Sequence, residues 1–212
     1  MHILIVGIKA SGKGTQARQI AEELNVPHIS SGDLLREIDK TSPLGKEVRS
    51  YIDKGNYIPD KLILKIVSQR LAEDDCQKGV VFDGFPRTLV QAKAFDKSYK
   101  FDKVIFIDIS KKNALHRIAG RWTCSNEHCN ISYNILTTPK PQKPGICDEC
   151  GSKLFQREDE TKEAALKRIN TDLKEMNPML EFYEKQRIVI KINGEQSIQD
   201  VHAEIVQKLC LH

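Results

Sequence analysis

The sequence has few aromatic residues and no long apolar run. Aromatic residues make up 6% of its 212 positions, with Trp122 as the single tryptophan. No stretch of eighteen apolar residues occurs, so no transmembrane helix is predicted. The opening stretch MHILIVGIKA has no basic leader and its apolar run ends at Gly7, which predicts a β-strand rather than a signal peptide. We therefore expect a cytoplasmic protein.

The excess of positive charge is also small. The chain carries 33 Lys and Arg against 29 Asp and Glu, a formal net charge of +4. That excess suits phosphate ligands but is too small to indicate nucleic acid as a partner. The length allows one well-packed core with small insertions, and neither an internal repeat nor a low-complexity tract is present.

Short β-rich segments alternate with helical patterns along the chain. Five such segments occur, at residues 2–6, 27–30, 80–83, 103–109 and 188–192. Each is almost continuously apolar, as is typical of parallel strands covered on both faces. Helical patterns such as GTQARQIAEEL and PDKLILKIVSQRL lie between them. The pattern predicts an α/β fold with a five-stranded parallel sheet, whose ligands gather at the carboxyl ends of the strands.

Two segments interrupt this alternation. Residues 31–59 have helical patterns without a strand, and residues 122–156 are polar and rich in Pro, Cys and Lys. A structureless loop as long as the second segment is improbable in a compact domain, so we expect it to have its own stabilising site. The predicted domains are a core of residues 1–30, 60–120 and 158–212, a helical insertion of residues 31–59, and a second insertion of residues 121–157.

A glycine-rich stretch follows the first expected strand. In GIKASGKGTQA, Gly7, Gly12 and Lys13 fit the G-x-x-x-x-G-K pattern of a loop whose backbone amides hold phosphate. The general pattern continues at once with Ser or Thr, but here Gly14 follows and the hydroxyl comes one position later, at Thr15. The alternative is a glycine-rich strand–helix turn without a ligand.

Four motifs together resemble the adenylate kinase family of nucleoside monophosphate kinases. They are GKGTQA, SSGDLLR, DGFPRT and RIAGR, in the order of that family. Lys-Gly-Thr is the usual form of its phosphate loop, and Mg²⁺ is held there largely through waters and the phosphates. The resemblance implies a P-loop kinase core, a nucleoside monophosphate (NMP)-binding insertion at 31–59 and a lid at 121–157. It also implies Mg²⁺-dependent phosphoryl transfer, ATP + AMP ⇌ 2 ADP.

The resemblance also implies which residues bind each nucleotide. Those matching ATP contacts are Gly7, Ala10, Ser11, Gly12, Lys13, Gly14, Thr15, Arg117, Arg121, Ser132, Tyr133 and Gln196. Those matching AMP contacts are Ser31, Arg36, Asn56, Tyr57, Ile58, Gly84, Phe85, Pro86, Arg87, Gln91, Arg157 and Arg168. Those matching the catalytic set are Lys13, Asp83, Arg87, Arg121, Arg157 and Arg168. Asp33, Asp159 and Glu160 match supporting carboxylates.

The chemistry of these side chains agrees with the roles. Arg36 and Arg87 can each bind phosphate oxygens in a bidentate way, although alone either one reads as a surface ion pair. Asp83 ends an apolar strand, where a carboxylate can order Mg²⁺-bound waters or cap a helix. The amide of Gln91 offers a donor and an acceptor to adenine, or is an exposed helical side chain. In the reaction that the resemblance implies, the AMP phosphate is the nucleophile, so we expect catalysis to consist of alignment, charge neutralisation and exclusion of water.

Four cysteines lie in the second insertion. Cys147 and Cys150 form a C-x₂-C pair, and Cys124 and Cys129 form a looser C-x₄-C pair. Four thiolates predict a closed, structural Zn²⁺ site, with a disulfide as the alternative. The resemblance agrees, because one branch of the family has a zinc-bound lid. CSNEHC is two residues longer than the pattern of that branch, which leaves a hypothesis that His128 replaces a flanking cysteine.

Several positions depart from the family pattern. Lys9 and Ala10 stand where the phosphate loop usually has Pro and Gly, so we expect a slightly altered ATP affinity. Trp122 stands where a second Arg is frequent, and we expect it to pack on the lid. Asn134 replaces a frequent His.

Two rival functions remain open at this stage. One is a kinase for another monophosphate or another donor base. The other is a zinc-ribbon nucleic-acid-binding module fused to an ATPase, although the segment NISYNILTTPKPQKPG has one aromatic residue and two lysines. We expect ATP, AMP and ADP as partners, neither nucleic acid nor membrane, and a monomer.

Overall fold

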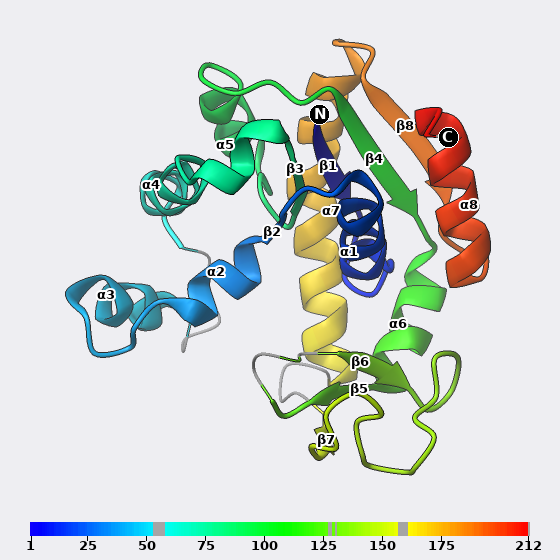
Figure 1. Ribbon diagram of the computed structural model, residues 1–212. Coiled ribbons are helices and arrows are strands. Elements are labelled where there is room, and N and C mark those ends of the chain that lie inside the picture. Colours follow the sequence, from blue (N-terminus) through cyan, green and yellow to red (C-terminus); the bar gives the residue numbers. More distant parts are fainter. Residues whose placement is uncertain (53–57, 127–128, 130, 157–160, 212) are drawn as a thin grey trace. The chain divides into compact units, whose positions relative to one another are not determined.

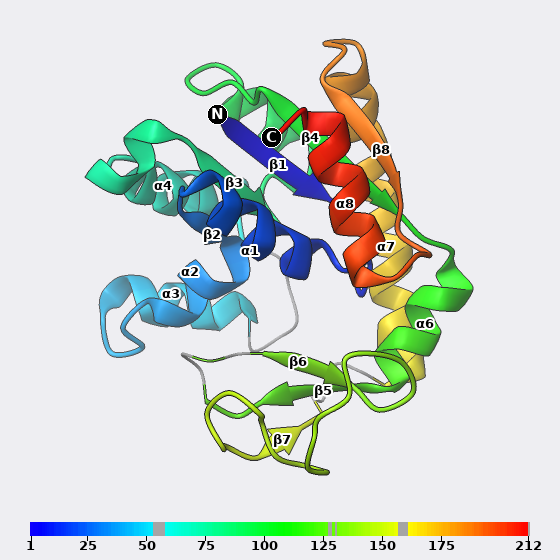
Figure 2. The ribbon, with the colours of Figure 1, turned by 45° about the vertical axis from the view of Figure 1, so that its right-hand side comes forward.

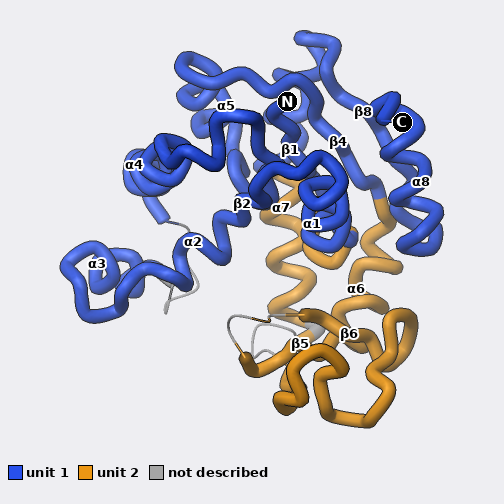
Figure 3. Tube along the Cα trace, viewed as in Figure 1, with its two compact units in different colours: residues 1–7, 12–108, 175–212 blue, residues 8–11, 109–174 orange. Residues whose placement is uncertain are grey.

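The described chain divides into two compact units. The structure is a computed structural model that describes residues 1–52, 58–126, 129, 131–156 and 161–211. The first unit comprises Met1–Gly7, Gly12–Asp108 and Glu175–His212, and the second comprises Ile8–Ser11 and Ile109–Lys174 (Figure 3). Each unit has its own cluster of buried apolar side chains.

The first unit is built on a parallel sheet, as the sequence predicts. Its described strands are β1 (His2–Val6), β2 (His28–Ser30), β3 (Val80–Asp83), β4 (Lys103–Asp108) and β8 (Val189–Asn193). All pair in parallel in the order β2-β3-β1-β4-β8 (Figure 1). The five predicted β-rich segments are therefore confirmed, each within a residue or two of its expected ends.

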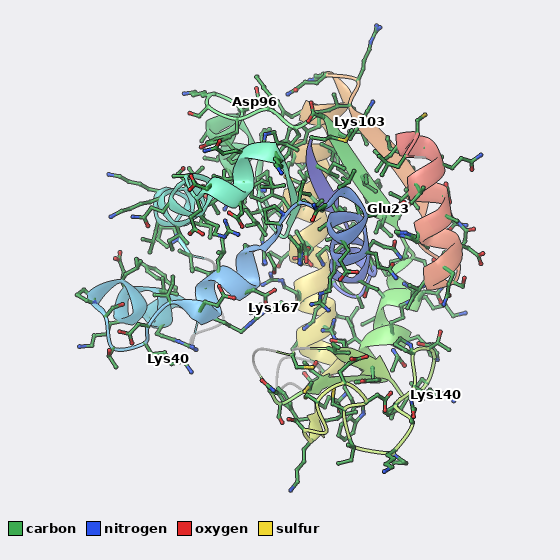
Figure 4. The ribbon with its side chains drawn as sticks, in the orientation of Figure 1. Glu23, Lys40, Asp96, Lys103, Lys140 and Lys167 are labelled. Atoms are coloured by element: carbon green, nitrogen blue, oxygen red, sulfur yellow. The ribbon has the colours of Figure 1, made fainter. Side chains whose placement is uncertain are left out.

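Six α-helices lie within the first unit in the described part of the chain, and only some of them pack on the sheet. They are α1 (Lys13–Leu24), α2 (Ser31–Glu37), α3 (Pro43–Ile52), α4 (Asp60–Leu71), α5 (Leu89–Phe95) and α8 (Ile198–Leu209), with a short 3-10 helix, η1 (Asp74–Lys78). Apolar residues of α1 and α8 pack in one cluster with Ile3, Ile5 and Ile105. Oε2 of Glu23 on α1 lies 3.2 Å from Nε2 of His202 on α8. Figure 4 labels Glu23 on its helix.

The opposite face of the sheet carries an aromatic cluster. The ring centroid of Phe82 on β3 lies 5.5 Å from that of Phe95 on α5 and 5.6 Å from that of Phe101. Phe101 in turn meets the fully buried Tyr183 at 5.8 Å. Because Val81 faces α1 and Phe82 faces away from it, β3 is apolar on both sides, as expected of a strand inside a parallel sheet.

The register of the sheet brings two motifs to one edge. Asp83, the last residue of β3, lies opposite Ser30, the last residue of β2, and opposite Ile5 of β1. SSGDLLR and DGFPRT therefore begin at the same carboxyl edge, where open α/β sheets place their ligands. Ser30 and Thr88 cap α2 and α5 by accepting hydrogen bonds from the backbone N–H groups of Asp33 and Gln91.

The second unit contains a small antiparallel sheet and two helices. Its strands are β5 (Arg121–Cys124), β6 (Ser132–Asn134) and β7 (Leu154–Phe155), paired in the order β6-β5-β7 (Figure 2). The helix α6 (Lys111–Ala119) leads into the sheet, and α7 (Lys162–Glu184) begins in this unit and ends in the first. Trp122 packs against the buried cluster of Cys124, Tyr133, Cys147 and Leu154, as expected.

The domain division expected from the sequence stays a prediction. In the structure, α2 and α3 of the expected NMP-binding insertion group with the sheet in the first unit, and the lid strands group with α6 and the start of α7. Among the described residues, no helix combines the length and the apolar character needed to cross a membrane.

Candidate functional site

The phosphate loop contains two residues with left-handed backbone. Gly12, at the start of α1, has φ 93°, and Ala10 has φ 66°. Glycine adopts positive φ without a steric penalty, whereas the same conformation costs alanine about 1 kcal/mol of conformational free energy. α1 begins at Lys13, so the backbone amides of its first turn are available to an anion. Thr15 is exposed on this turn.

Gly14 explains why no hydroxyl follows the lysine directly. A Cβ at position 14 would lie 3.1 Å from Oδ2 of Asp83, closer than most such contacts. The glycine therefore lets the carboxylate at the end of β3 approach the first turn of α1. Within the described chain, Oδ1 of Asp83 is buried and has no hydrogen-bond partner. A carboxylate oxygen in that state suits the hydration shell of Mg²⁺, and Asp83 so fits its predicted role.

The DGFPRT turn holds Arg87 in a defined orientation. Gly84, at φ 75°, presents its carbonyl oxygen to Oγ of Ser31 at 2.7 Å and to Nε of Arg87 at 2.6 Å. Nη2 of Arg87 also donates to Ser31 Oγ at 3.2 Å. A Cβ on Gly84 would lie 2.9 Å from Ser31 Oγ, so this close arrangement requires glycine. The structure thus brings together three residues predicted to bind AMP, from two separate motifs.

Gln91 lies behind this turn and is buried. Its Oε1 accepts from the backbone N–H of Arg87 at 2.7 Å, and its Nε2 donates to Oδ1 of Asp60 at 2.7 Å. The alternative of an exposed helical glutamine is therefore wrong. Each end of the amide retains one further donor or acceptor position. Phe85, Pro86 and Ile58, also predicted to contact AMP, are buried.

Arg36 lies on α2 beside a carboxylate of its own helix. It forms an ion pair with Asp33, whose backbone N–H is capped by Ser30. Burial alone would raise the pKa of the Asp33 carboxyl, but the hydrogen bond and charge of Arg36 outweigh it and lower that pKa. Arg36 is about two-fifths exposed, so its guanidinium is accessible to an anion.

In the second unit, Arg117 contacts the phosphate-loop backbone directly, and Arg168 is connected to it through Asp172. Nη1 of Arg117 on α6 donates to the carbonyl oxygens of Ala10 and Ser11, each at 3.4 Å. Nε of Arg168 on α7 pairs with Oδ1 of Asp172 at 3.0 Å, and Oδ2 of Asp172 accepts from the backbone N–H of Lys9 at 3.2 Å. Ser11 is itself buried.

The strands β5 and β6 position the remaining lid residues. Arg121 on β5 lies opposite Asn134 on β6. Asn134 is buried, donates from Nδ2 to the carbonyl oxygen of Arg117 at 2.8 Å, and accepts from two backbone N–H groups of the following turn. Ser132 is exposed on β6. Gln196, in the first unit, hydrogen-bonds Asn193 and Glu204.

Tyr133, predicted to contact ATP, instead faces the cysteines in this structure. It is 5% exposed, and its hydroxyl accepts from the backbone N–H of Asp148 at 2.8 Å and lies 3.6 Å from Sγ of Cys147. The side chain therefore supports the turn that carries Cys147. A contact between this residue and ATP stays a prediction.

The four predicted cysteines form one cluster. The sulfurs of Cys124, Cys129, Cys147 and Cys150 all lie within 4.8 Å of one another. Two pairs are closer, with 3.3 Å between Cys124 and Cys150 and 3.7 Å between Cys129 and Cys147. All four are free thiols, which excludes the disulfide alternative in this structure. Tetrahedral coordination at about 2.3 Å places sulfurs about 3.8 Å apart, so the cluster is compatible with Zn²⁺.

The surroundings of the cluster affect its thiols differently. Cys150 is exposed, and hydrogen bonds from the side chain and backbone of Ser152 lower its pKa to about 6. Burial raises the pKa of Cys124 to about 12. Gly151 follows at φ 71°, and its N–H donates to the carbonyl oxygen of Cys147 at 3.0 Å, closing the C-x₂-C turn. A metal ion that took up all four sulfurs would displace their protons.

Some predicted residues lie outside the described part of the chain. They are Asn56, Tyr57, His128, Arg157, Asp159 and Glu160. The hypothesis that His128 replaces a cysteine is therefore untested.

Three residues in these contacts were not singled out from the sequence, or were noted only as a departure. Asp60 bonds Gln91, Asp172 joins Lys9 to Arg168, and Asn134 holds the end of α6. The i,i+4 spacing of Arg168 and Asp172 is a visible signal for an ion pair on a helix. The contacts to Gln91 and Lys9 join segments far apart in the sequence, and spacing carries no signal for them.

Fold and sites together define the class of this protein. A parallel sheet whose first strand leads into a glycine-rich loop, with a helix that begins at the loop lysine, is the arrangement of P-loop nucleotide-binding proteins. The arginines at the carboxyl edge and in the second unit indicate phosphoryl transfer. The family model described as "Adenylate kinase" matches residues 5–188. The chain belongs to the adenylate kinase family.

Similar proteins named adenylate kinase support this family assignment over nearly the whole length of the chain. An adenylate kinase of Geobacillus sp. (strain WCH70) is 41% identical over 215 residues, which cover 99% of this chain and 98% of the relative. That of Brevibacillus brevis is 42% identical, covering 97% of each chain. That of Bacillus subtilis (strain 168) is 41% identical, covering 97% of this chain and 96% of the relative.

Proposed function

We propose that this chain catalyses the reversible Mg²⁺-dependent transfer of a phosphoryl group, ATP + AMP ⇌ 2 ADP. Membership of the adenylate kinase family makes it a phosphotransferase of the nucleoside monophosphate kinase type. The observation that carries the acceptor assignment is the arrangement of Ser31 and Arg87 on the Gly84 carbonyl oxygen. It holds a guanidinium ready for the phosphate of a monophosphate without the need to order it on binding.

On the acceptor side, charge and base are bound by different residues. Arg36 and Arg87 neutralise the phosphate of AMP. Gln91 uses its remaining donor and acceptor positions on the adenine edge, while its contacts to Arg87 and Asp60 keep the amide from rotating. Ile58, Phe85 and Pro86 supply apolar surface around the base. We assign Asn56 and Tyr57 to the same subsite, and Arg157 and Arg168 to the transferring phosphate.

On the donor side, backbone amides and cations hold the phosphates of ATP. Lys13 and the first turn of α1 bind their oxygens, and we assign Arg117 and Arg121 to the same nucleotide. Adenylate kinases use Mg²⁺ with ATP, and the ion, when bound, neutralises charge on the β- and γ-phosphate oxygens. The buried Oδ1 of Asp83 would accept hydrogen bonds from the waters of that ion. Exclusion of other water then favours transfer to AMP over hydrolysis.

The metal of the cysteine cluster is proposed to be Zn²⁺ in a structural role. Four thiolates fill a tetrahedral shell and leave no open position for a substrate. The cluster replaces part of the apolar core that β5, β6 and β7 lack. We also propose a monomeric enzyme of the cytoplasm, a compartment in which thiols stay reduced and available to a metal ion.

The deciding experiment measures transfer from Mg·ATP to AMP, CMP, UMP and GMP side by side. We expect rapid ADP formation with AMP and turnover at least about tenfold slower with the others, since a bidentate contact between a glutamine amide and adenine discriminates against another base by about 1–3 kcal/mol. Faster turnover with another acceptor would overturn the assignment of Gln91. ADP formed without an acceptor would support the rival ATPase, which a salt-dependent shift with a single-stranded oligonucleotide would test independently.

Two variants sharpen this result. Arg87→Ala removes the oriented guanidinium and is expected to lower kcat/KM for AMP about a hundredfold. Glu163→Gln removes a charge from an exposed position on α7 and serves as the matched control. A similar loss in both would argue against a specific role for Arg87.

A further inference from the structure

Asp172 connects the phosphate loop to a lid-side arginine. Its two carboxylate oxygens have different partners: Oδ2 accepts from the Lys9 backbone N–H at 3.2 Å, and Oδ1 pairs with Arg168 Nε at 3.0 Å. Lys9, Arg168 and Asp172 all belong to the second unit (Figure 3). The Asp172 side chain is 17% exposed, so both contacts are partly shielded from water.

Ala10, the loop residue that follows Lys9, has a backbone conformation that neighbouring contacts must stabilise. Ala10 has φ 66°, a conformation that costs alanine about 1 kcal/mol and persists where surrounding contacts hold it. Two such contacts flank it, with Asp172 on the N–H of Lys9 and Arg117 on the carbonyl oxygens of Ala10 and Ser11. The loop backbone is thus held on one side through a donor and on the other through acceptors.

The contact depends on the identity of residue 9. The family pattern usually has proline at this position, and proline has no backbone N–H to donate. Lysine restores the donor, and Asp172 supplies the acceptor 163 residues later in the chain. The lysine side chain takes no part in this hydrogen bond. The departure at Lys9 therefore supplies a backbone donor that proline lacks.

We infer that Asp172 is a positioning residue, which fixes the phosphate-loop backbone and the Arg168 guanidinium through one rigid carboxylate. The inference rests on the proposed function, in which the loop binds ATP and Arg168 contacts the transferring phosphate. A carboxylate is suited to this task because it offers two acceptors at a fixed separation. An asparagine offers one acceptor and one donor, and can keep just one of the two contacts.

A double-mutant cycle on turnover tests the coupling. Asp172→Ala, which keeps neither contact, and Lys9→Pro are each expected to lower kcat about tenfold, a displacement effect on aligned groups, with little change in KM for AMP. The double variant should be no worse than Asp172→Ala by more than about twofold, because both changes break the link between Lys9 and residue 172. Lys9→Ala keeps the N–H and should match wild type more closely than Lys9→Pro. Glu163→Gln is the matched charge control on α7.

Nuclear magnetic resonance on the unliganded protein provides a readout independent of activity. The Lys9 amide proton is expected to exchange at least about tenfold faster in Asp172→Ala than in wild type or Glu163→Gln. An unchanged exchange rate, multiplicative losses in the double variant, or full kcat in Asp172→Ala would overturn the inference. A wild-type protein that forms no ADP from ATP and AMP would refute the proposed function, and the exchange measurement would still decide whether Asp172 anchors the loop.

Discussion

At the scale of single residues, the lack of a side chain at Gly14 allows the carboxylate of Asp83 to lie close to the first turn of α1. Gly14→Ala places a methyl group 3.1 Å from Asp83 Oδ2, so the carboxylate must move by a few tenths of an ångström. We expect kcat to fall about tenfold and the Mg²⁺ concentration for half-maximal rate to rise. Stability should stay level or increase, since alanine favours a helix over glycine by up to about 1 kcal/mol.

The measurement is a Mg²⁺ titration of ADP formation beside urea denaturation. Gly14→Ser, which restores the more general G-K-S pattern, should also be slower than wild type because its Cβ meets the same oxygen. An unaltered Mg²⁺ requirement in both variants would contradict the role given to Asp83.

Gln91 allows a test of the contacts behind the AMP subsite. Gln91→Glu keeps the acceptor for the Arg87 N–H but turns the donor toward Asp60 into a second carboxylate. We expect a loss of about 2 kcal/mol in the free energy of unfolding at pH 7, from repulsion and an unsatisfied buried group.

The pH dependence of this loss has a definite sign. Burial beside Asp60 raises the folded-state pKa of the new carboxyl group, so its protonated form is favoured by folding. Stability relative to wild type should therefore recover as the pH falls through that raised pKa. Urea denaturation at pH 7 and pH 5 measures the difference. Adding Asp60→Asn should recover most of the lost free energy of unfolding at pH 7. No recovery in the double variant would contradict repulsion by Asp60 as the cause.

At the scale of helices and strands, much of the first unit could be predicted from the sequence. Continuous apolar segments such as 2–6 and 103–109 predict buried parallel strands, because each of their faces packs against a helix or loop. The strands β5, β6 and β7 could not be predicted in the same way. They are two to four residues long, and the buried Thr123 and Asn134 depend on pairing that periodicity does not encode.

The same contrast applies to the candidate site. Gly84, Arg87 and Gln91 could be assigned because they fall within one short motif, and local spacing carries that information. Asp60 and Asp172 could not, because each meets its site partner only after the chain has folded. The alternative prediction, an exposed helical Gln91, fails for the same reason, because the contact of Gln91 with Asp60 forms only in the folded chain.

The order of strands in the sheet predicts how much each contributes to stability. Ile105 on β4 is fully buried between β1 and β8, whereas its neighbour Ile190 on the edge strand β8 is half-buried. Ile105→Ala should cost about 3 kcal/mol by loss of packing and creation of a cavity. Ile190→Ala should cost about 1 kcal/mol. Urea denaturation of both variants provides the comparison, and equal losses would contradict the central placement of β4.

At the scale of the whole molecule, two kinds of core stabilise one chain. The first unit has an apolar cluster that joins the four strands β1, β3, β4 and β8 to α1 and α8. The described core of the lid strands has four buried residues, two of which, Cys124 and Cys147, are predicted metal ligands. A core that small contributes little hydrophobic free energy, so metal coordination must supply much of the remainder.

Removal of the metal should therefore unfold one unit selectively. We expect purified protein to contain one Zn²⁺ per chain, and a strong chelator to increase amide hydrogen exchange in β5, β6 and the cysteine turns. Exchange in β1 and β4 should stay slow, because the core of the first unit contains none of the four cysteines. Mass spectrometry of exchanged peptides, with and without chelator, makes this comparison.

Cys147→Ser should lose the metal, whereas Cys210→Ser, at an exposed cysteine outside the cluster, should keep it. Unchanged exchange in the lid strands after metal loss would remove the structural role of the ion, and loss of protection in both units would show that the two cores unfold together.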